Sequence, residues 1–206
     1  MAVSTRHKWL NGLLAGTLCI VAVCVAQQAS VVIAADWLSY STINNMRKWA
    51  LGESPYTTAQ WEQARSDLLA AAALTPKDAI LHDSLAELHA LQGRALWTTG
   101  APDSPEVALY QQALSHQMVS LQLRPTHGMA WASVALYQYA INSDAESLFK
   151  PWREAIRLSP REEDVLRTLL DMAPSVWSIA PEDIRRWIRD TDPKLAAKLE
   201  SQPESR

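Results

Sequence analysis

The segment that most constrains the fold is residues 128–160, whose pattern predicts two helices joined by a turn. Apolar side chains recur at helical spacing along both helices. Their positions are Trp131, Val134, Ala135, Leu148, Trp152 and Ala155, and Pro160 ends the second helix. The alanines suit places where helices approach closely, and the tryptophans fill the space beside them. One helix pair cannot bury its own apolar face, so the pattern predicts that further pairs stack on it.

This pattern resembles the tetratricopeptide repeat, in which helix A and helix B form a unit of roughly 34 residues that ends in proline. Three tripeptides with a final proline close successive units; they are Leu74-Thr75-Pro76, Leu123-Arg124-Pro125 and Leu158-Ser159-Pro160. The last two prolines are about one repeat apart, and a loop at residues 98–105 accounts for the wider spacing of the first two. The resemblance implies an all-α fold, a tetratricopeptide-like α-solenoid over residues 57–174.

The other repeat units carry weaker versions of the same pattern. Their expected packing positions are Ala64, Leu68, Ala71, Pro76, Leu85, Ala86, Ala113 and Pro125. His82 and His89 stand where helix A usually has tryptophan and tyrosine, and we interpret them as partly buried packing residues. Two helical turns separate them, about 10 Å, which is too far for both to bind one metal ion. Pro174 is expected to end the last repeat helix.

Residues 9–35 contain no charged side chain, and Arg6 and Lys8 precede them. This run is long enough to span a bilayer, which needs about 20 residues. Its length, and the position of Trp37 and Tyr40 where an interfacial aromatic belt would lie, favour an uncleaved signal anchor. The alternative is a signal peptide cleaved after a small residue near the end of the run. In both cases the basic residues predict a cytoplasmic start and an exported bulk.

The sequence therefore divides into four parts. They are a membrane or signal segment at 1–35, a connecting helix at 36–56, repeats at 57–174, and closing helices with a polar tail at 175–206. If the protein is bacterial, the expected location is the inner membrane, with a single span and the soluble part in the periplasm.

Charge and motif content argue against several function classes. The formal net charge of −3 does not favour a nucleic-acid partner, which requires a basic face. The sequence contains no P-loop, dinucleotide-binding glycine motif, G-x-S-x-G or H-E-x-x-H. Cys19 and Cys24 both lie in the uncharged run, so the soluble part has no cysteine for a disulfide or zinc site. We expect a protein that is not an enzyme, without catalytic residues, cofactor or metal.

In a helical-repeat array, the concave face lined by the A helices usually carries the binding function. The residues expected there lie between the packing positions. They are Asp83, Glu87, Met129, Ala132, Tyr139, Arg167 and Asp171. A surface that mixes acidic, basic and apolar side chains suits a peptide or a partner protein better than a nucleic acid.

Three segments carry a family resemblance: AADWLSYSTINNMRKWA at 34–50, RPTHGMAWASVALYQYAINSDAESLFKPWREAIRLSPREEDVLRTLL at 124–170, and PEDIRRWIRDTDPKLAAKL at 181–199. Together with the N-terminal apolar run and the irregular repeats, they resemble the VpsP-type proteins of bacterial exopolysaccharide gene clusters. The resemblance implies a membrane-associated accessory that binds proteins of polysaccharide synthesis or export, and it implies no catalytic residues. The alternative is an exported repeat adaptor in another envelope process, such as secretion or cell-wall assembly.

Overall fold

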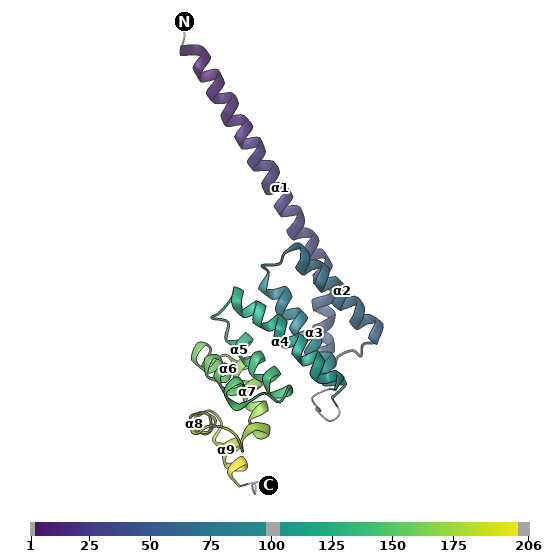
Figure 1. Cartoon of the computed structure of the whole chain (residues 1–206), viewed down its shortest axis with the longest axis vertical. Helices are drawn as coiled ribbons and strands as arrows, with labels where there is room; N and C mark the ends of the chain where they lie inside the picture. The colour runs from purple at the N-terminus through teal and green to yellow at the C-terminus, as the bar shows by residue number, and fades with distance from the viewer. Residues whose placement is uncertain (1–2, 98–103, 202–206) are drawn as a thin grey trace.

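The computed structural model describes residues 3–97 and 104–201, with side chains from residue 16 onward. Within these residues every regular element is an α-helix and no strand occurs, as the sequence predicted (Figure 1). The helices are α1 (Val3–Ala50), α2 (Thr58–Leu74), α3 (Ala79–Ala95), α4 (Pro105–Leu123), α5 (Gly128–Ala140), α6 (Ala145–Leu158), α7 (Glu163–Val176), α8 (Glu182–Thr191) and α9 (Pro193–Glu200).

Helix α1 spans 48 residues and joins the apolar N-terminal run to the packed domain without a break. Its first part extends alone and its last part lies against other helices (Figure 1). No glycine or proline occurs between Gly16 and Gly52, so no residue interrupts the helix. Gly52 ends it with a left-handed φ of 71°, and the Glu53 N–H donates to the Lys48 carbonyl at 2.9 Å. The backbone therefore has no break at residue 35, where the sequence divides the anchor from the connecting helix.

Among the described residues, α1 alone is long and apolar enough to cross a membrane. The side chains between Gly16 and Ser30 are exposed, whereas Ala35 is 2% exposed because it packs in a cluster with α2. Residues 35–50 thus belong to the packed domain, whereas residues 16–30 do not.

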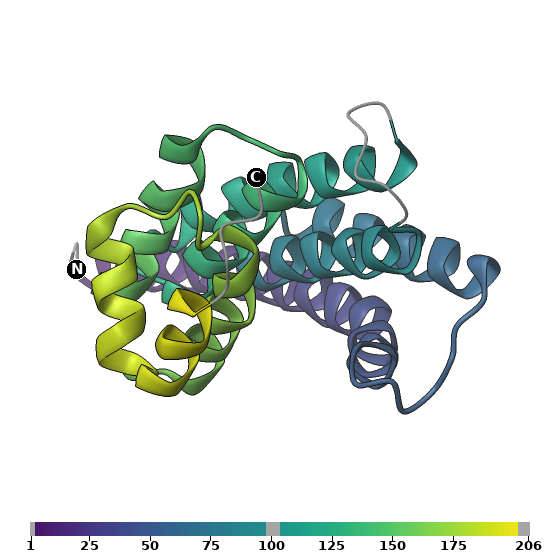
Figure 2. The same cartoon turned by 90° about the horizontal axis from the view of Figure 1, so that it is seen from below.

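The other helices pack mainly against their neighbours in sequence, from α1 on α2 through to α5 on α6, while α7 packs chiefly on α5. Helices α8 and α9 pack on each other and close the end of the molecule away from the N-terminus (Figures 1 and 2). The domain is therefore an ordered succession of helices rather than a bundle around one centre.

The turns after α2, α4 and α6 have nearly the same backbone conformation. Their first residues have φ values of −129°, −136° and −136° and ψ values of 69°, 70° and 60°; they are Thr75, Arg124 and Ser159. The carbonyl of each accepts a hydrogen bond from the residue three positions later, at 3.0, 3.1 and 3.4 Å. The next helix begins four residues after each of them. The three proline-ended tripeptides therefore mark three equivalent turns.

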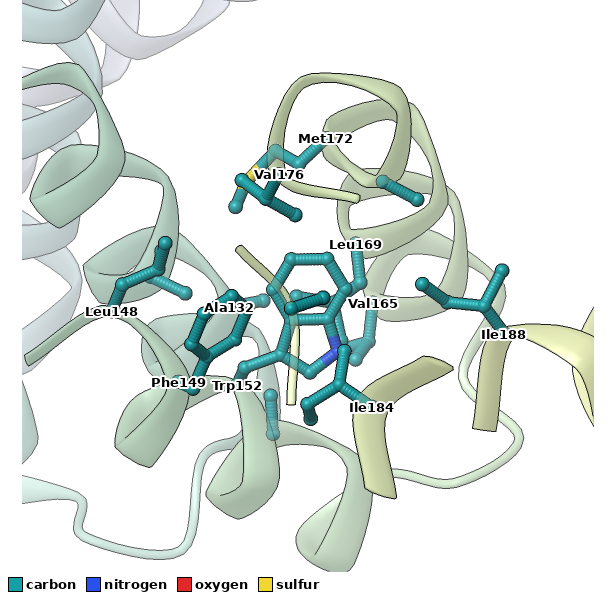
Figure 3. Packing of buried hydrophobic residues seen from close by; sticks show 14 of the residues in the cluster. Ala132, Leu148, Phe149, Trp152, Val165, Leu169, Met172, Val176, Ile184 and Ile188 are labelled. Atoms are coloured by element: carbon teal, nitrogen blue, oxygen red, sulfur yellow. The ribbon is translucent and has the colours of Figure 1, made fainter. Parts of the chain in front are cut away.

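The larger apolar cluster joins α5 to α9 around Trp152 (Figure 3). Trp152 is fully buried, with its ring centre 6.0 Å from Phe149 and 6.1 Å from Trp187. Figure 3 shows Leu169 and Ile184 beside its indole ring. A second cluster joins α1, α2 and α3 and includes two tryptophans, one buried and one partly buried. We call the first cluster the Trp152 core.

Most of the expected packing residues are buried. The buried ones are Ala64, Leu68, Ala71, Leu85, Ala86, Ala113, Val134, Ala135, Leu148, Trp152 and Ala155. Pro76, Pro125 and Pro160 lie exposed in the three equivalent turns. Trp131 differs from Trp152 because it is only partly buried, and its indole N–H donates to the Pro125 carbonyl at 2.8 Å.

Pro174 does not end α7, contrary to the expectation from the sequence. The helix continues to Val176. A proline at this position removes one hydrogen bond of the helix, and its ring crowds the carbonyl four residues earlier, but only two residues of the helix follow it. Ala173 and Val176 remain buried in the Trp152 core, and their packing offsets that loss.

Candidate functional site

The candidate site is a hollow of about 300 Å³ between α3 and α5, which we call the α3–α5 hollow. Helix α3 contributes five residues to its wall and α5 contributes five more. One residue each comes from α1, α4, α7 and the turn before α5. The lining residues are Ala50, Asp83, Glu87, Ala90, Leu91, Arg94, Gln117, His127, Met129, Ala130, Ser133, Leu136, Tyr137 and Thr168.

Asp83 lies on the wall of the hollow in a fixed position. Its carboxylate accepts a hydrogen bond from the Gln117 side-chain amide at 2.8 Å and forms an ion pair with Arg124. These contacts join α3 to the middle and the end of α4. Because Arg124 balances the charge of Asp83, this carboxylate is a structural part of the site.

Glu87 follows Asp83 by one helical turn and has a different environment. No side chain among the described residues forms an ion pair with it. Desolvation by the surrounding protein raises the pKa of the Glu87 carboxyl group, while Arg94 and Arg47 oppose that shift. The Glu87 side chain nevertheless keeps exposed surface at the opening of the hollow. It is therefore an accessible carboxylate whose contact with water is reduced.

Tyr137 and Arg94 add polar groups to the lining of the hollow. Burial raises the pKa of the Tyr137 hydroxyl, and the charge of Glu87 acts in the same direction, while a hydrogen bond with Ser133 opposes both. Tyr110 lies behind Tyr137, with 6.1 Å between the ring centres, and forms a hydrogen bond with Arg94. These hydroxyl groups stay protonated at neutral pH, so they can donate or accept hydrogen bonds but cannot supply a negative charge.

Apolar side chains fill the space between these polar groups. They are Ala90, Leu91, Met129, Ala130 and Leu136. An apolar wall with a few convergent polar groups is the usual composition of a site that binds a side chain or a small ligand. The arrangement offers recognition of shape and charge.

The structure brings together three of the seven residues expected on the concave face. Asp83, Glu87 and Met129 line the hollow. Tyr139, Arg167 and Asp171 are exposed but lie outside it. Arg167 forms an ion pair with Asp164, one turn earlier on α7.

Ala132 requires a correction. It was expected to line the concave face, but it is fully buried in the Trp152 core and cannot contact a partner. It was assigned to that face because it lies between the packing positions Trp131 and Val134 in the sequence. The neighbouring Ser133 lines the hollow instead.

Sequence reasoning missed several lining residues, of which Arg94, Gln117 and Tyr137 carry polar groups. Arg94 is seven positions after Glu87, so helical spacing alone could have placed it on the same face. No such signal exists for Gln117, because it comes from the following helix and reaches the site only through the packing of α4 on α3.

Three histidines lie in the α3–α4 interface, outside the hollow. His82 and His116 have their Nδ1 atoms 3.5 Å apart, and the ring of His116 stacks on that of His89 at 5.7 Å between centres. Desolvation lowers the pKa of His89 to about 4, and the neighbouring His116 and Arg65 act in the same direction. Among the described residues, no group of three or more His, Cys, Asp or Glu side chains is placed so that it could hold a metal ion.

The chain was also compared with known proteins. No protein-family model matches it, and no curated protein matches it.

Proposed function

We propose that this protein is a membrane-anchored helical-repeat scaffold that acts as an accessory in bacterial exopolysaccharide biosynthesis or export. The observation that carries the proposal is the continuity of α1, which joins an exposed apolar half directly to the packed domain. Such a helix holds the domain, and the hollow in it, at a fixed place beside the membrane. A scaffold needs a location and a binding surface, and it needs no nucleophile.

The three equivalent turns support the tetratricopeptide-like α-solenoid within this proposal. The same φ and ψ values, the same turn hydrogen bond and the same distance to the next helix recur after α2, α4 and α6. Packing of α7 on α5, two helices away in sequence, is the contact that successive A helices make in such an array. On this basis α3, α5 and α7 are A helices, and the hollow lies on their shared face.

The basic residues before the uncharged run indicate on which side of the membrane the packed domain lies. Arg6 and Lys8 precede the uncharged run, and basic residues stay on the cytoplasmic side. The proposed location is therefore the bacterial inner membrane, with a single span and the packed domain in the periplasm. The sequence likeness to VpsP-type proteins supplies the polysaccharide part of the proposal.

The α3–α5 hollow is the proposed docking site for a partner protein of this machinery. Glu87 offers a carboxylate without an ion pair among the described residues, and Met129 and Leu136 offer apolar contact beside it. Replacing Glu87 by Lys should weaken partner binding while the fold is kept, because the side chain is exposed and forms no ion pair among the described residues. Asp83→Lys is unsuitable for this purpose, since it removes the ion pair with Arg124.

The decisive experiment uses a strain in which the gene is deleted. We expect reduced polymer output, restored by the full chain and restored only in part when residues 1–35 are replaced by a cleavable signal, because the local concentration near partners falls. The Glu87→Lys chain should also fail to restore output although it accumulates normally. Normal polymer in the deletion strain would exclude this function and leave an adaptor role in another envelope process.

A further inference from the structure

The turn between α2 and α3 lies beside the end of the uncharged run of α1. Helices α1 and α2 pack as antiparallel neighbours, and the Thr42 hydroxyl donates to the Asp67 carboxylate at 3.3 Å. Ala35 lies seven residues before Thr42 in α1, and Leu74 lies seven residues after Asp67 in α2. Both helices rise about 1.5 Å per residue, so Ala35 and Leu74 are at the same level.

The turn itself continues beyond that level. Residues 75–78 then reverse the chain in a turn that the Asp78 N–H closes on the Thr75 carbonyl, at the end of the domain where α1 leaves it (Figure 1). The burial agrees with this register, because Val31 is partly buried whereas its neighbours Val32 and Ile33 are exposed. The turn therefore lies beside the last residues of the uncharged segment.

The length of helix that a bilayer requires indicates which residues of α1 lie in the membrane. About 20 residues of helix cross the hydrocarbon layer, and counted from Trp9 they end near Gln28. Gln27, Gln28 and Ser30 are polar residues that gather near this end of the run, as expected where the hydrocarbon gives way to headgroups. The last residues of the run, 31–35, then lie in the headgroup layer, and the α2–α3 turn begins at the same level.

The exposed side chains of this turn suit that layer. Leu74 and Ile80 flank the turn and are 41% and 57% exposed. Lys77 lies between them and is exposed as well. Exposed aliphatic side chains have no role in the packing of the domain, but beside a bilayer they enter the interface while a lysine ammonium group reaches lipid phosphate.

We propose that the α2–α3 turn is a second membrane-contact surface, in which Leu74 and Ile80 enter the headgroup layer and Lys77 contacts lipid phosphate. This inference rests on the anchoring by α1 proposed above. A single helix fixes the distance of the domain from the membrane but leaves it free to tilt and rotate. A second contact on one side of α1 removes that freedom and presents the α3–α5 hollow in one orientation.

The test uses the full chain reconstituted in vesicles of phosphatidylethanolamine and phosphatidylglycerol, with an environment-sensitive fluorophore on a single cysteine. Three variants are needed. Cys24→Ala leaves Cys19 in the apolar part of α1 as the reporter of anchoring. Ile80→Cys, with both native cysteines replaced by alanine, reports on the turn. Ile179→Cys in the same background is the matched control, since Ile179 is also 57% exposed but lies after α7, at the far end of the domain.

Lipids with brominated acyl chains quench a fluorophore only where it contacts the bilayer. We expect strong quenching and a blue-shifted emission on Cys19, clear quenching at position 80, and none at position 179. Quenching on Cys19 without quenching at position 80 would overturn this inference and leave the anchor intact. Absence of quenching on Cys19 would overturn the anchor and the inference together.

Two further outcomes are informative. If position 80 is shielded without lipid quenching, and the shielding grows with protein density in the vesicle, a second copy of the chain covers the turn and the inference is wrong. If the membrane contact is correct, Lys77→Glu should reduce quenching at position 80 in vesicles rich in phosphatidylglycerol, and should leave the signal of Cys19 unchanged.

Discussion

The two main interfaces of the packed domain bury different chemistry. The Trp152 core is built from aliphatic, aromatic and alanine side chains of α5 to α9. The interface of α3 with α4 instead buries polar side chains beside its small apolar ones; they are Ser84, His89, Glu106, Gln117 and Ser120. The first interface closes the end of the molecule away from the N-terminus, and the second lies behind the proposed binding site.

The difference indicates that the two interfaces have different roles: one mainly stabilises the fold, and the other mainly fixes how its helices are aligned. Apolar burial stabilises without regard to direction, so the Trp152 core can carry much of the free energy of folding. Buried polar groups cost free energy unless they are paired, but they fix the register of the helices that carry them. The contact of Gln117 with Asp83 is an example, because it ties α4 to the wall of the α3–α5 hollow.

The largest expected effect tests the apolar side of this comparison. Trp152→Ala removes a fully buried indole from the centre of its core and should lower the free energy of unfolding by about 3–5 kcal/mol. Denaturant titration of the detergent-solubilised chain, followed by circular dichroism, measures it. Trp131→Ala is the control; Trp131 is only partly buried, and we expect a loss of about 1–2 kcal/mol. Equal losses for the two tryptophans would contradict the arrangement of this core.

The second prediction concerns the polar α3–α4 interface and how the stability of the protein changes with pH. Burial holds the pKa of His89 at about 4 in the folded state, whereas an unfolded histidine has its ordinary pKa near 6.5. The unfolded chain therefore takes up a proton first as the pH falls, and the stability is lost between about pH 6.5 and pH 4. At roughly 1.4 kcal/mol for each pKa unit, the loss is at most about 3.5 kcal/mol.

The measurement compares unfolding free energies across this pH range for the parent chain and for His89→Gln. Carboxylates titrate in both proteins, so the difference between the two curves isolates the histidine. Its stack with His116 and the nearby Arg65 act against a charge on His89, so the parent should lose more stability than the variant as the pH falls. Parallel curves would show that His89 does not titrate in this way.

A third prediction concerns the contact between two of the equivalent turns. A Cβ atom on Gly128 would lie only 2.5 Å from the Cβ of Ser159, so the turn before α5 and the turn after α6 touch. Gly128→Ala should therefore destabilise the protein by about 1–3 kcal/mol through overpacking. Ser159→Gly in the same chain should restore most of that loss in thermal melts. If the double variant is no more stable than Gly128→Ala alone, these turns are not in contact.

Much of the fold could be predicted from the sequence, because the helices and their ends depend on patterns among residues that are close in the chain. Helical spacing predicted the buried positions Leu85 and Trp152, and proline-ended tripeptides predicted the ends of α2, α4 and α6. The prediction that Pro174 ends α7 was wrong, because the effect of a proline depends on its place in the helix and on the packing around it. The signal-anchor interpretation implied that the apolar run continues into the next helix, and Val3–Ala50 is one uninterrupted helix.

The residues of the candidate site were harder to predict from the sequence than the fold, for a physical reason. Asp83 and Glu87 share a face of one helix, so spacing was sufficient to group them. Ala132 and Ser133 are adjacent, and about 100° of rotation decides which one faces the core, so a small error in register exchanges them. Gln117 and Thr168 reach the hollow only through contacts between helices, and no spacing along the chain encodes those contacts.

The smallest expected effect lies on the surface of the Trp152 core. Arg153 on α6 and Asp183 on α8 form an ion pair with two contacts, Nε to Oδ2 at 2.7 Å and Nη2 to Oδ1 at 3.2 Å. Both side chains are about half exposed, so solvent screens the pair and its coupling should be only about 0.2–1 kcal/mol. A double-mutant cycle with Arg153→Ala and Asp183→Ala measures that coupling. Arg153 lowers the pKa of Asp183, so the contribution is present above the ordinary aspartate pKa and is lost as the pH falls below it. A coupling as large as the loss in Trp152→Ala would mean that charge, rather than apolar burial, holds α8 against α6, and the contrast between the two interfaces would fail.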